Sequence, residues 1–458
     1  MNKQIVVVII LLLSLLFVTG EIQSVKAINI NEDGTIAGTD KIQRNGDIYT
    51  LTDDIFDTIR VKRDNIVIDG AGYTLDRNEI ERNPTGIIFL EVNDVTIKNF
   101  KITGFARGIT LKGLGNIVTR CTITDCSTGI WLNGASNSTV SDNKFFNIKS
   151  GIQLDYSLNN QFRNNKFENG TISTGLDGNF NDIDPSNTID GKPIYYLVNK
   201  QDLVISPSNY PELGYLALIK CTDITVKDLT ISGTTTYDNG IILRYTTNSM
   251  ISNNTLVNLW SGIWSYNSYN TTITKNTISN NRKGIAIVTT SANIITQNNI
   301  KNNQVGISLS GSAQRIYHNN FINNILNVDS ADWSGLNRKV MPYGMHFWDN
   351  GYPSGGNFWS GHNLIDINND DIGDTAYEVS QYRNNTDRYP LMETYDIFSL
   401  ELPTPTPTRT STPTPTTTPT PTSSPEPEFP TTLVIASVAV IAVVGLGVLA
   451  YYKKKRKP

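Results

Sequence analysis

The chain has 458 residues, a formal net charge of −4 and only 17% charged residues. This balance excludes the basic surface that nucleic-acid binding requires. Three cysteines are too few for a disulfide framework, so packing and hydrogen bonds must hold the fold together.

The first residues are typical of a secretory signal. Lys3 precedes an apolar run at residues 5–18, and a cleavage site fits after Ala27. We therefore predict that residues 1–27 form a signal peptide and that the body of the protein lies outside the cytoplasm.

From residue 86 onward, a glycine followed by isoleucine recurs every 21 or 22 residues within two blocks. The glycines are Gly86, Gly108, Gly129 and Gly151, then Gly240, Gly262, Gly284 and Gly306. Further apolar columns stand six and eleven residues before them, in short β-branched runs that favour strands. A unit this short cannot bury its own apolar face, so the repeat predicts a solenoid. We expect an all-β fold, a right-handed parallel β-helix with about 22 residues per coil and a cap at each end.

A polar column accompanies the repeat eight residues before the glycine. It contains Asn143, Asn254, Asn276 and Asn298, and Asn165 and Asn319 extend it. Asparagine tolerates a left-handed backbone, and stacked amides can bond along the axis, so we predict a structural ladder without a catalytic role.

The cysteines are interpreted mainly as small buried residues. Cys121 takes the place of the column asparagine in its own coil, and the others are Cys126 and Cys221. A bridge between Cys121 and Cys126, or a soft-metal site, is the alternative.

The repeat and the composition divide the exported body into three parts. Residues 28–85 are predicted to form an N-terminal cap with the first coils, and residues 86–339 the β-helix itself. The register breaks at 171–239, which we interpret as an excursion from the solenoid. Residues 340–400 are rich in Trp, Tyr, Gly and Asp, and they are predicted to cap the open end.

The C-terminal region has the composition of a surface anchor. Thr-Pro repeats in residues 401–430 predict an extended stalk, and residues 431–452 are predicted to form a transmembrane helix. The basic tail at 453–458 places the C-terminus in the cytoplasm. A cleaved lipid-anchor signal is the alternative, although such tails rarely end in a basic run. Five Asn-X-Ser/Thr sequons fit a single-pass glycoprotein of the cell surface.

The residues two and four positions after each glycine should point outward, because side chains alternate along a strand. This outward face includes three aromatic rings and three polar groups: Trp131, Gln153, Asp155, Arg244, Trp264 and Tyr266. Flat rings beside hydrogen-bonding groups suit a sugar, so these residues form a predicted carbohydrate-binding strip. The alternative is that the rings pack beneath the excursion. Asp155 is the single acid of the face, whereas glycoside hydrolysis usually needs two, so we predict no catalytic residues there.

A candidate calcium loop lies near the end of the body. Oxygen ligands alternate along it at Asp366, Asn368, Asp370 and Asp374. Asp371 occupies the position where an EF-hand needs glycine, and the loop has no terminal glutamate. A calcium site and a turn rich in Asx residues are both compatible with this pattern.

Five segments resemble the NosD-type β-helix family, which overlaps the class of carbohydrate-binding proteins and sugar hydrolases. They are Ile66–Leu75 (IVIDGAGYTL), Asn187–Lys200 (NTIDGKPIYYLVNK), Phe347–Trp359 (FWDNGYPSGGNFW), Asp370–Tyr377 (DDIGDTAY) and Asp387–Met392 (DRYPLM). The resemblance covers residues 30–395, and the signal, stalk and single span are similar to those of archaeal surface proteins.

The family name implies copper delivery to nitrous-oxide reductase. Copper sites use His, Met and Cys, but His318, His346 and His362 are not paired at short spacing. The resemblance therefore carries the fold and the exported location, and we do not expect copper binding.

Together these patterns predict a membrane-anchored, outward-facing binding or scaffold module for glycans or other cell-envelope partners. Two alternatives remain open: a polysaccharide-degrading hydrolase or lyase, and a copper-binding accessory protein.

Overall fold

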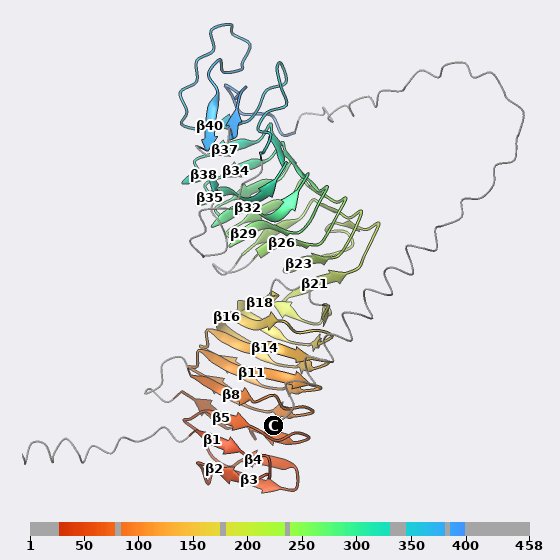
Figure 1. Ribbon diagram of the computed structural model, residues 1–458, viewed down its shortest axis with the longest axis vertical. Coiled ribbons are helices and arrows are strands. Elements are labelled where there is room, and N and C mark those ends of the chain that lie inside the picture. The colour runs from red at the N-terminus through yellow and green to blue at the C-terminus, as the bar shows by residue number, and fades with distance from the viewer. Residues whose placement is uncertain are drawn as a thin grey trace, which may run out of the picture. The chain divides into compact units, whose positions relative to one another are not determined.

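A computed structural model describes residues 27–77, 84–174, 180–233, 239–329, 345–380 and 385–398 (Figure 1). Throughout these ranges the regular secondary structure is strand, as predicted. None of them contains a helix that is long and apolar enough to cross a membrane. The predicted signal sequence up to residue 26, the stalk, the transmembrane segment and the basic tail lie outside the described residues.

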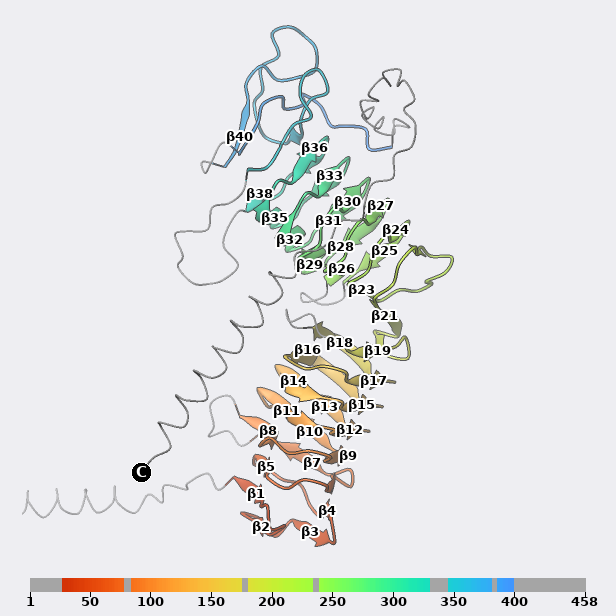
Figure 2. The same ribbon diagram turned by 45° about the vertical axis from the view of Figure 1, so that its right-hand side comes forward.

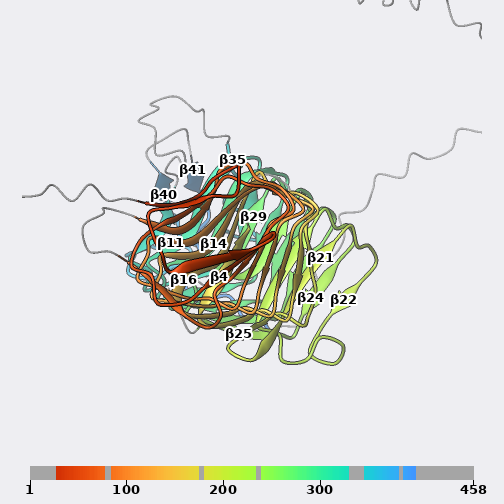
Figure 3. The same ribbon diagram turned by 90° about the horizontal axis from the view of Figure 1, so that it is seen from below.

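The central coils each contribute three short strands. In one coil these are β12 (Ile117–Thr119), β13 (Thr122–Thr124) and β14 (Thr128–Ser136). They pair in parallel with β15 (Thr139–Ser141) and with the long bent strand β16 (Lys144–Asp155) of the next coil. Figure 2 shows the resulting faces, and Figure 3 looks along the stack.

The three predicted apolar columns form the core. Val118 pairs with Val140, Ile123 with Phe145, and Ile130 with Ile152, all within the stack. These side chains are buried. The β-helix and its repeat length of about 22 residues are therefore confirmed, since residues one repeat apart are in register.

The repeated glycine is required by the close approach of successive coils. A Cβ atom on Gly129 would lie 2.4 Å from the carbonyl oxygen of Gly151 and 2.7 Å from the Phe145 ring. Real Cβ contacts do not reach such distances, so any other residue would push the coils apart.

The asparagine column forms the predicted ladders. In the first block, Asn143 Nδ2 donates to Asn165 Oδ1 over 3.0 Å, and Asn165 Nδ2 donates to Asn187 Oδ1 over 2.9 Å. The same carbonyl oxygens also accept backbone N–H groups of the preceding coil. The left-handed backbone falls one residue earlier than expected, as at Asp142 and Asn164, where φ is 57° and 54°.

The second ladder is longer and has a different final member. It runs through Asn254, Asn276, Asn298, Asn319 and Asn357 and ends at Asp387.

Cys121 and Cys126 are buried free thiols, in agreement with the simpler interpretation of these residues. Burial raises the pKa of each thiol to about 12, so both remain protonated.

The predicted excursion at 171–239 is largely part of the solenoid. β19 (Asp182–Ile183) and β20 (Thr188–Ile189) complete another coil on β17 (Gln161–Arg163) and β18 (Lys166–Thr174). The chain then reverses in a tight hairpin, and β21 (Lys192–Val198) begins a second series of coils through parallel pairing with β23 (Tyr215–Ile219). The interruption in the glycine repeat marks this reversal.

The reversal separates two hydrophobic cores. The first includes the columns of the N-terminal coils, and the second includes Leu216, Ile263, Ile285 and Ile307. Ile219 and Ile242, on the other side of the second-series sheet from Leu216 and Leu243, belong to the first core cluster. The outer face of that sheet is therefore covered at its N-terminal end.

Caps close both ends, as predicted. At the N-terminus, β3 (Ile42–Asn45) and β4 (Ile48–Leu51) form an antiparallel hairpin. At the C-terminus, Trp359 stacks on Phe321 with ring centroids 4.3 Å apart and on Tyr377 at 4.2 Å. These rings cover the last coil of the second core.

The hydroxyl of Ser265 is buried beside the second core, and we expect its removal to stabilise the protein. Ser265 stands between Leu243 and Ile287 in an inward column, and its Oγ has no hydrogen-bond partner. Ser265→Ala should raise the free energy of unfolding by about 1 kcal/mol, because it removes an unsatisfied polar group.

The matched control for this substitution is Ser268→Ala. Ser268 Oγ donates to the Tyr266 carbonyl over 3.1 Å and accepts the Thr246 N–H over 3.0 Å. Its loss should destabilise the body by about 1 kcal/mol. Urea unfolding of both variants measures the two changes in the free energy of unfolding. Changes of the same sign would contradict the prediction.

Candidate functional site

The N-terminal half of the predicted strip converges on one carboxylate. Trp131 on β14 and Gln153 on β16 are in register on adjacent coils. Trp131 Nε1 donates to Asp155 Oδ2 over 2.6 Å, and Gln153 Nε2 donates to the same oxygen over 2.7 Å. All three side chains are half-buried on the outward face.

Arg107 completes this cluster, and the sequence analysis did not identify it. Its guanidinium carbon lies 4.1 Å from the Trp131 ring centroid, a cation–π contact on one face of the indole. Arg107 is exposed and pairs with Thr128 one coil along. The signal in the sequence was its position directly before Gly108, at the first residue of a strand. We call Arg107, Trp131, Gln153 and Asp155 the Trp131 cluster.

The Trp131 cluster offers hydrogen-bonding groups and a half-buried aromatic ring, with one acid. Both donors to Asp155 use Oδ2, so its Oδ1 can accept a ligand hydroxyl. Arg107 can donate hydrogen bonds from its exposed guanidinium. A single carboxyl group held by two donors does not supply the pair of acids that glycoside hydrolysis uses.

The C-terminal half of the strip comes together on a partly covered face, where Trp264 and Tyr266 are half-buried. Trp264 and Tyr266 stack with centroids 5.8 Å apart, and the Arg244 guanidinium lies 5.6 Å from the Trp264 centroid. Arg244 has 0% of its surface exposed, and Trp264 packs against the first core cluster. The predicted exposure of this half is wrong for Arg244. It is covered because the chain reversal places the neighbouring outer positions Ile219 and Ile242 in a core.

The residues at 366–374 form a loop that satisfies its own backbone. The Asp366 carboxylate accepts the N–H groups of Asn369 over 2.7 Å and Asp371 over 3.0 Å. Asp374 accepts the N–H of Ile367, and Asn368 donates to Asp370. These bonds are those of a turn rich in Asx residues, and calcium binding stays a prediction.

Copper binding, which the family name implies, requires donor side chains that gather around one point. No three His, Cys, Asp or Glu side chains in the described ranges gather closely enough to hold a metal ion. His318 stacks on Tyr395 at 4.4 Å, and His362 meets Tyr377 at 4.8 Å, whereas the thiols are buried in the core. This donor set does not fit copper.

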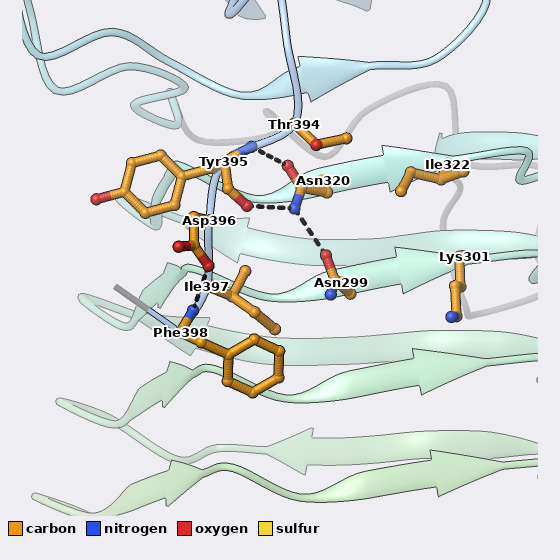
Figure 4. A pocket seen from close by; sticks show the side chains of 9 residues that line it. All are labelled: Asn299, Lys301, Asn320, Ile322, Thr394, Tyr395, Asp396, Ile397 and Phe398. Atoms are coloured by element: carbon orange, nitrogen blue, oxygen red, sulfur yellow. Dashed lines mark hydrogen bonds between the residues drawn. The ribbon is translucent and has the colours of Figure 1, made fainter. Parts of the chain in front are cut away.

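A shallow hollow lies on the flank of the second series (Figure 4). It has a volume of about 360 Å³ and lies between residues 394–398 and the outer side of β34 (Asn299–Lys301) and β37 (Asn320–Ile322). The Asn320 side chain makes two hydrogen bonds to the Tyr395 backbone. It donates to the carbonyl oxygen over 2.8 Å and accepts the N–H over 2.7 Å. The contact fixes the last described segment against the solenoid.

Comparisons with known proteins agree with this fold. Residues 181–364 match the family described as "Periplasmic copper-binding protein (NosD)", and residues 64–195 match "Right handed beta helix region". No curated protein sequence matches the chain.

Among solved structures, the A-module of the Azotobacter vinelandii mannuronan C-5 epimerase AlgE6 is 12% identical, with a TM-score of 0.30. The alignment covers 65% of this chain and 79% of that one. A tailspike protein of E. coli bacteriophage HK620, in complex with a hexasaccharide, is 11% identical with a TM-score of 0.29. That alignment covers 63% of this chain and 59% of the tailspike. The family matches and the observed coils together show that the chain is a right-handed β-helix protein whose residues 181–364 match the NosD family.

Proposed function

We propose that this protein is a non-cleaving glycan-binding module whose binding surface is the Trp131 cluster. The observation that supports it best is the shared Asp155 oxygen, which fixes an indole and an amide on an outward face. Sugar hydroxyls bind such charge-assisted arrays of donors and acceptors. The half-buried Trp131 ring offers aromatic surface on which the apolar C–H face of a sugar can pack.

The cluster predicts a defined loss of affinity. A glycan array probed with the full chain identifies the ligand, and Asp155→Asn should then weaken its binding about tenfold, because hydrogen bonds to a charged group contribute about 1.5–3 kcal/mol. Trp131→Ala should weaken it by a similar factor. Thr122→Ala, on another face of the same coil as Trp131, serves as the control.

Two outcomes would contradict this function. Unchanged glycan affinity in both cluster variants would remove the site, and release of reducing sugars or unsaturated uronates by the purified protein would favour the enzyme alternative.

We also propose that the module is displayed at the cell surface on the Thr-Pro stalk. Protease added to intact cells should release a soluble body, because an extended Pro-rich segment is open to cleavage whereas the coils are hydrogen-bonded throughout. Immunoblots of cells and medium check this expectation. A body that stays protected, with the basic tail accessible from outside, would reverse the orientation.

A further inference from the structure

A second hollow lies in the C-terminal cap, on elements that do not contribute to the Trp131 cluster. It has a volume of about 440 Å³ and is lined by residues 345–349 together with Thr386 and Arg388. Phe347 accepts the N–H of Ile316 over 2.7 Å and donates to the Gln314 carbonyl over 2.8 Å. The segment at 345–349, which forms one wall of the hollow, therefore continues the sheet of β36 (Arg315–Tyr317) and is held by the solenoid.

The cavity has an apolar wall that faces solvent. Met345 is 61% exposed and Phe347 is 51% exposed, whereas Trp348 is buried behind them. A side chain of either kind would normally bury more of its surface, so this wall is available to the apolar face of a ligand.

Two polar groups in the cavity are fixed in place. Asp349 is buried and holds Arg388 through two bonds, from Nε to Oδ2 over 2.9 Å and from Nη2 to Oδ1 over 2.6 Å. This pairing leaves Nη1 of Arg388 for another acceptor. It also cancels the guanidinium charge, so the cavity has no reason to select an anion.

His346 is the third element of the site. Its side chain lines the cavity and is 7% exposed, and its Nδ1 has no hydrogen-bond partner. Burial lowers the pKa of His346 to about 4, so the ring is neutral at physiological pH, with one nitrogen as a hydrogen-bond donor and the other as an acceptor. Nδ1 is itself covered, so a ligand hydroxyl bonds to it once the ring turns toward the hollow that it lines.

We propose that this cap cavity binds a single neutral pyranose ring. The C–H face of the sugar packs on Phe347 and Met345, one hydroxyl accepts from Arg388 Nη1, and another bonds to the His346 ring. The site is separate from the Trp131 cluster, and it does not depend on the function proposed for that cluster.

The test uses the full chain and two neutral probes, methyl α-glucopyranoside and methyl β-galactopyranoside, in saturation-transfer NMR titrations. We expect saturable binding of at least one probe in the millimolar range. Phe347→Ala should weaken it about tenfold, and His346→Phe, which keeps the ring packing against Trp348, should do the same. Phe398→Ala, an exposed ring outside the cavity, is the matched control for Phe347→Ala.

Several results would overturn the proposal. These are a lack of saturable binding of both probes, affinity unchanged by Phe347→Ala, or glucuronate binding tenfold more tightly than the matched neutral glucoside. Because Phe347 is half exposed, its alanine variant tests the site even if His346→Phe fails to fold. If Trp131→Ala abolishes probe binding and Phe347→Ala does not, the probe occupies the Trp131 cluster. That result rejects the cap site and leaves the proposed function intact.

Discussion

Replacing Ile130 with asparagine should destabilise the body by about 5 kcal/mol, enough to unfold many domains. Ile130 is completely buried and pairs with Ile109 in the preceding coil and Ile152 in the following one. The substitution loses about 2–4 kcal/mol of apolar packing and adds about 1–3 kcal/mol for a buried amide without a partner. Chemical denaturation, followed by far-UV circular dichroism, measures the loss.

Ile117→Asn is the matched control, because it makes the same change in the same coil. Ile117 is 37% exposed on β12, so its asparagine can bond to water, and we expect a loss below about 1 kcal/mol. Equal losses from the two substitutions would mean that inward and outward positions have been assigned incorrectly.

The end of the second ladder should make stability depend on pH. Asp387 accepts the Asn357 N–H over 2.7 Å and the Trp359 Nε1–H over 2.9 Å. Burial nevertheless raises its pKa from 3.8 to about 6, which exceeds the lowering by these hydrogen bonds. A carboxyl with a raised native pKa binds protons more tightly when folded, so its contribution to stability grows as the pH falls from about 6 to about 4.

This contribution is measured as a difference between two proteins. Other carboxyls, such as those of Asp349 and Asp69, have lowered pKa values and lose stabilising interactions in acid. We therefore compare the wild type with Asp387→Asn, which keeps an acceptor oxygen and does not titrate. From pH 7 to pH 4 the wild type should gain up to about 3 kcal/mol relative to the variant. A constant difference would show that folding leaves the pKa of Asp387 unshifted, and a falling difference that folding lowers it; either result would contradict the prediction.

The sequence by itself determined the coil. Glycine spacing, three apolar columns and the asparagine column were sufficient because each coil contacts mainly its neighbours, so one local pattern fixes the whole stack. The caps could be predicted for the same reason, since an apolar column that ends must be covered. Ile130, Gly129 and Asn143 each lie in the role that their place in the repeat predicts.

Only the tertiary structure decided which outward residues form a surface. Trp131 and Trp264 occupy equivalent places in the repeat, yet the first lies in an outward-facing cluster and the second packs against a core. The difference arises from the reversal between β20 and β21, whose effect on distant coils no local spacing records. Arg107 and the cap cavity were hidden for a related reason. Their contacts join strands and loops that are separate in sequence, and the alternation of side chains along one strand cannot identify such partners.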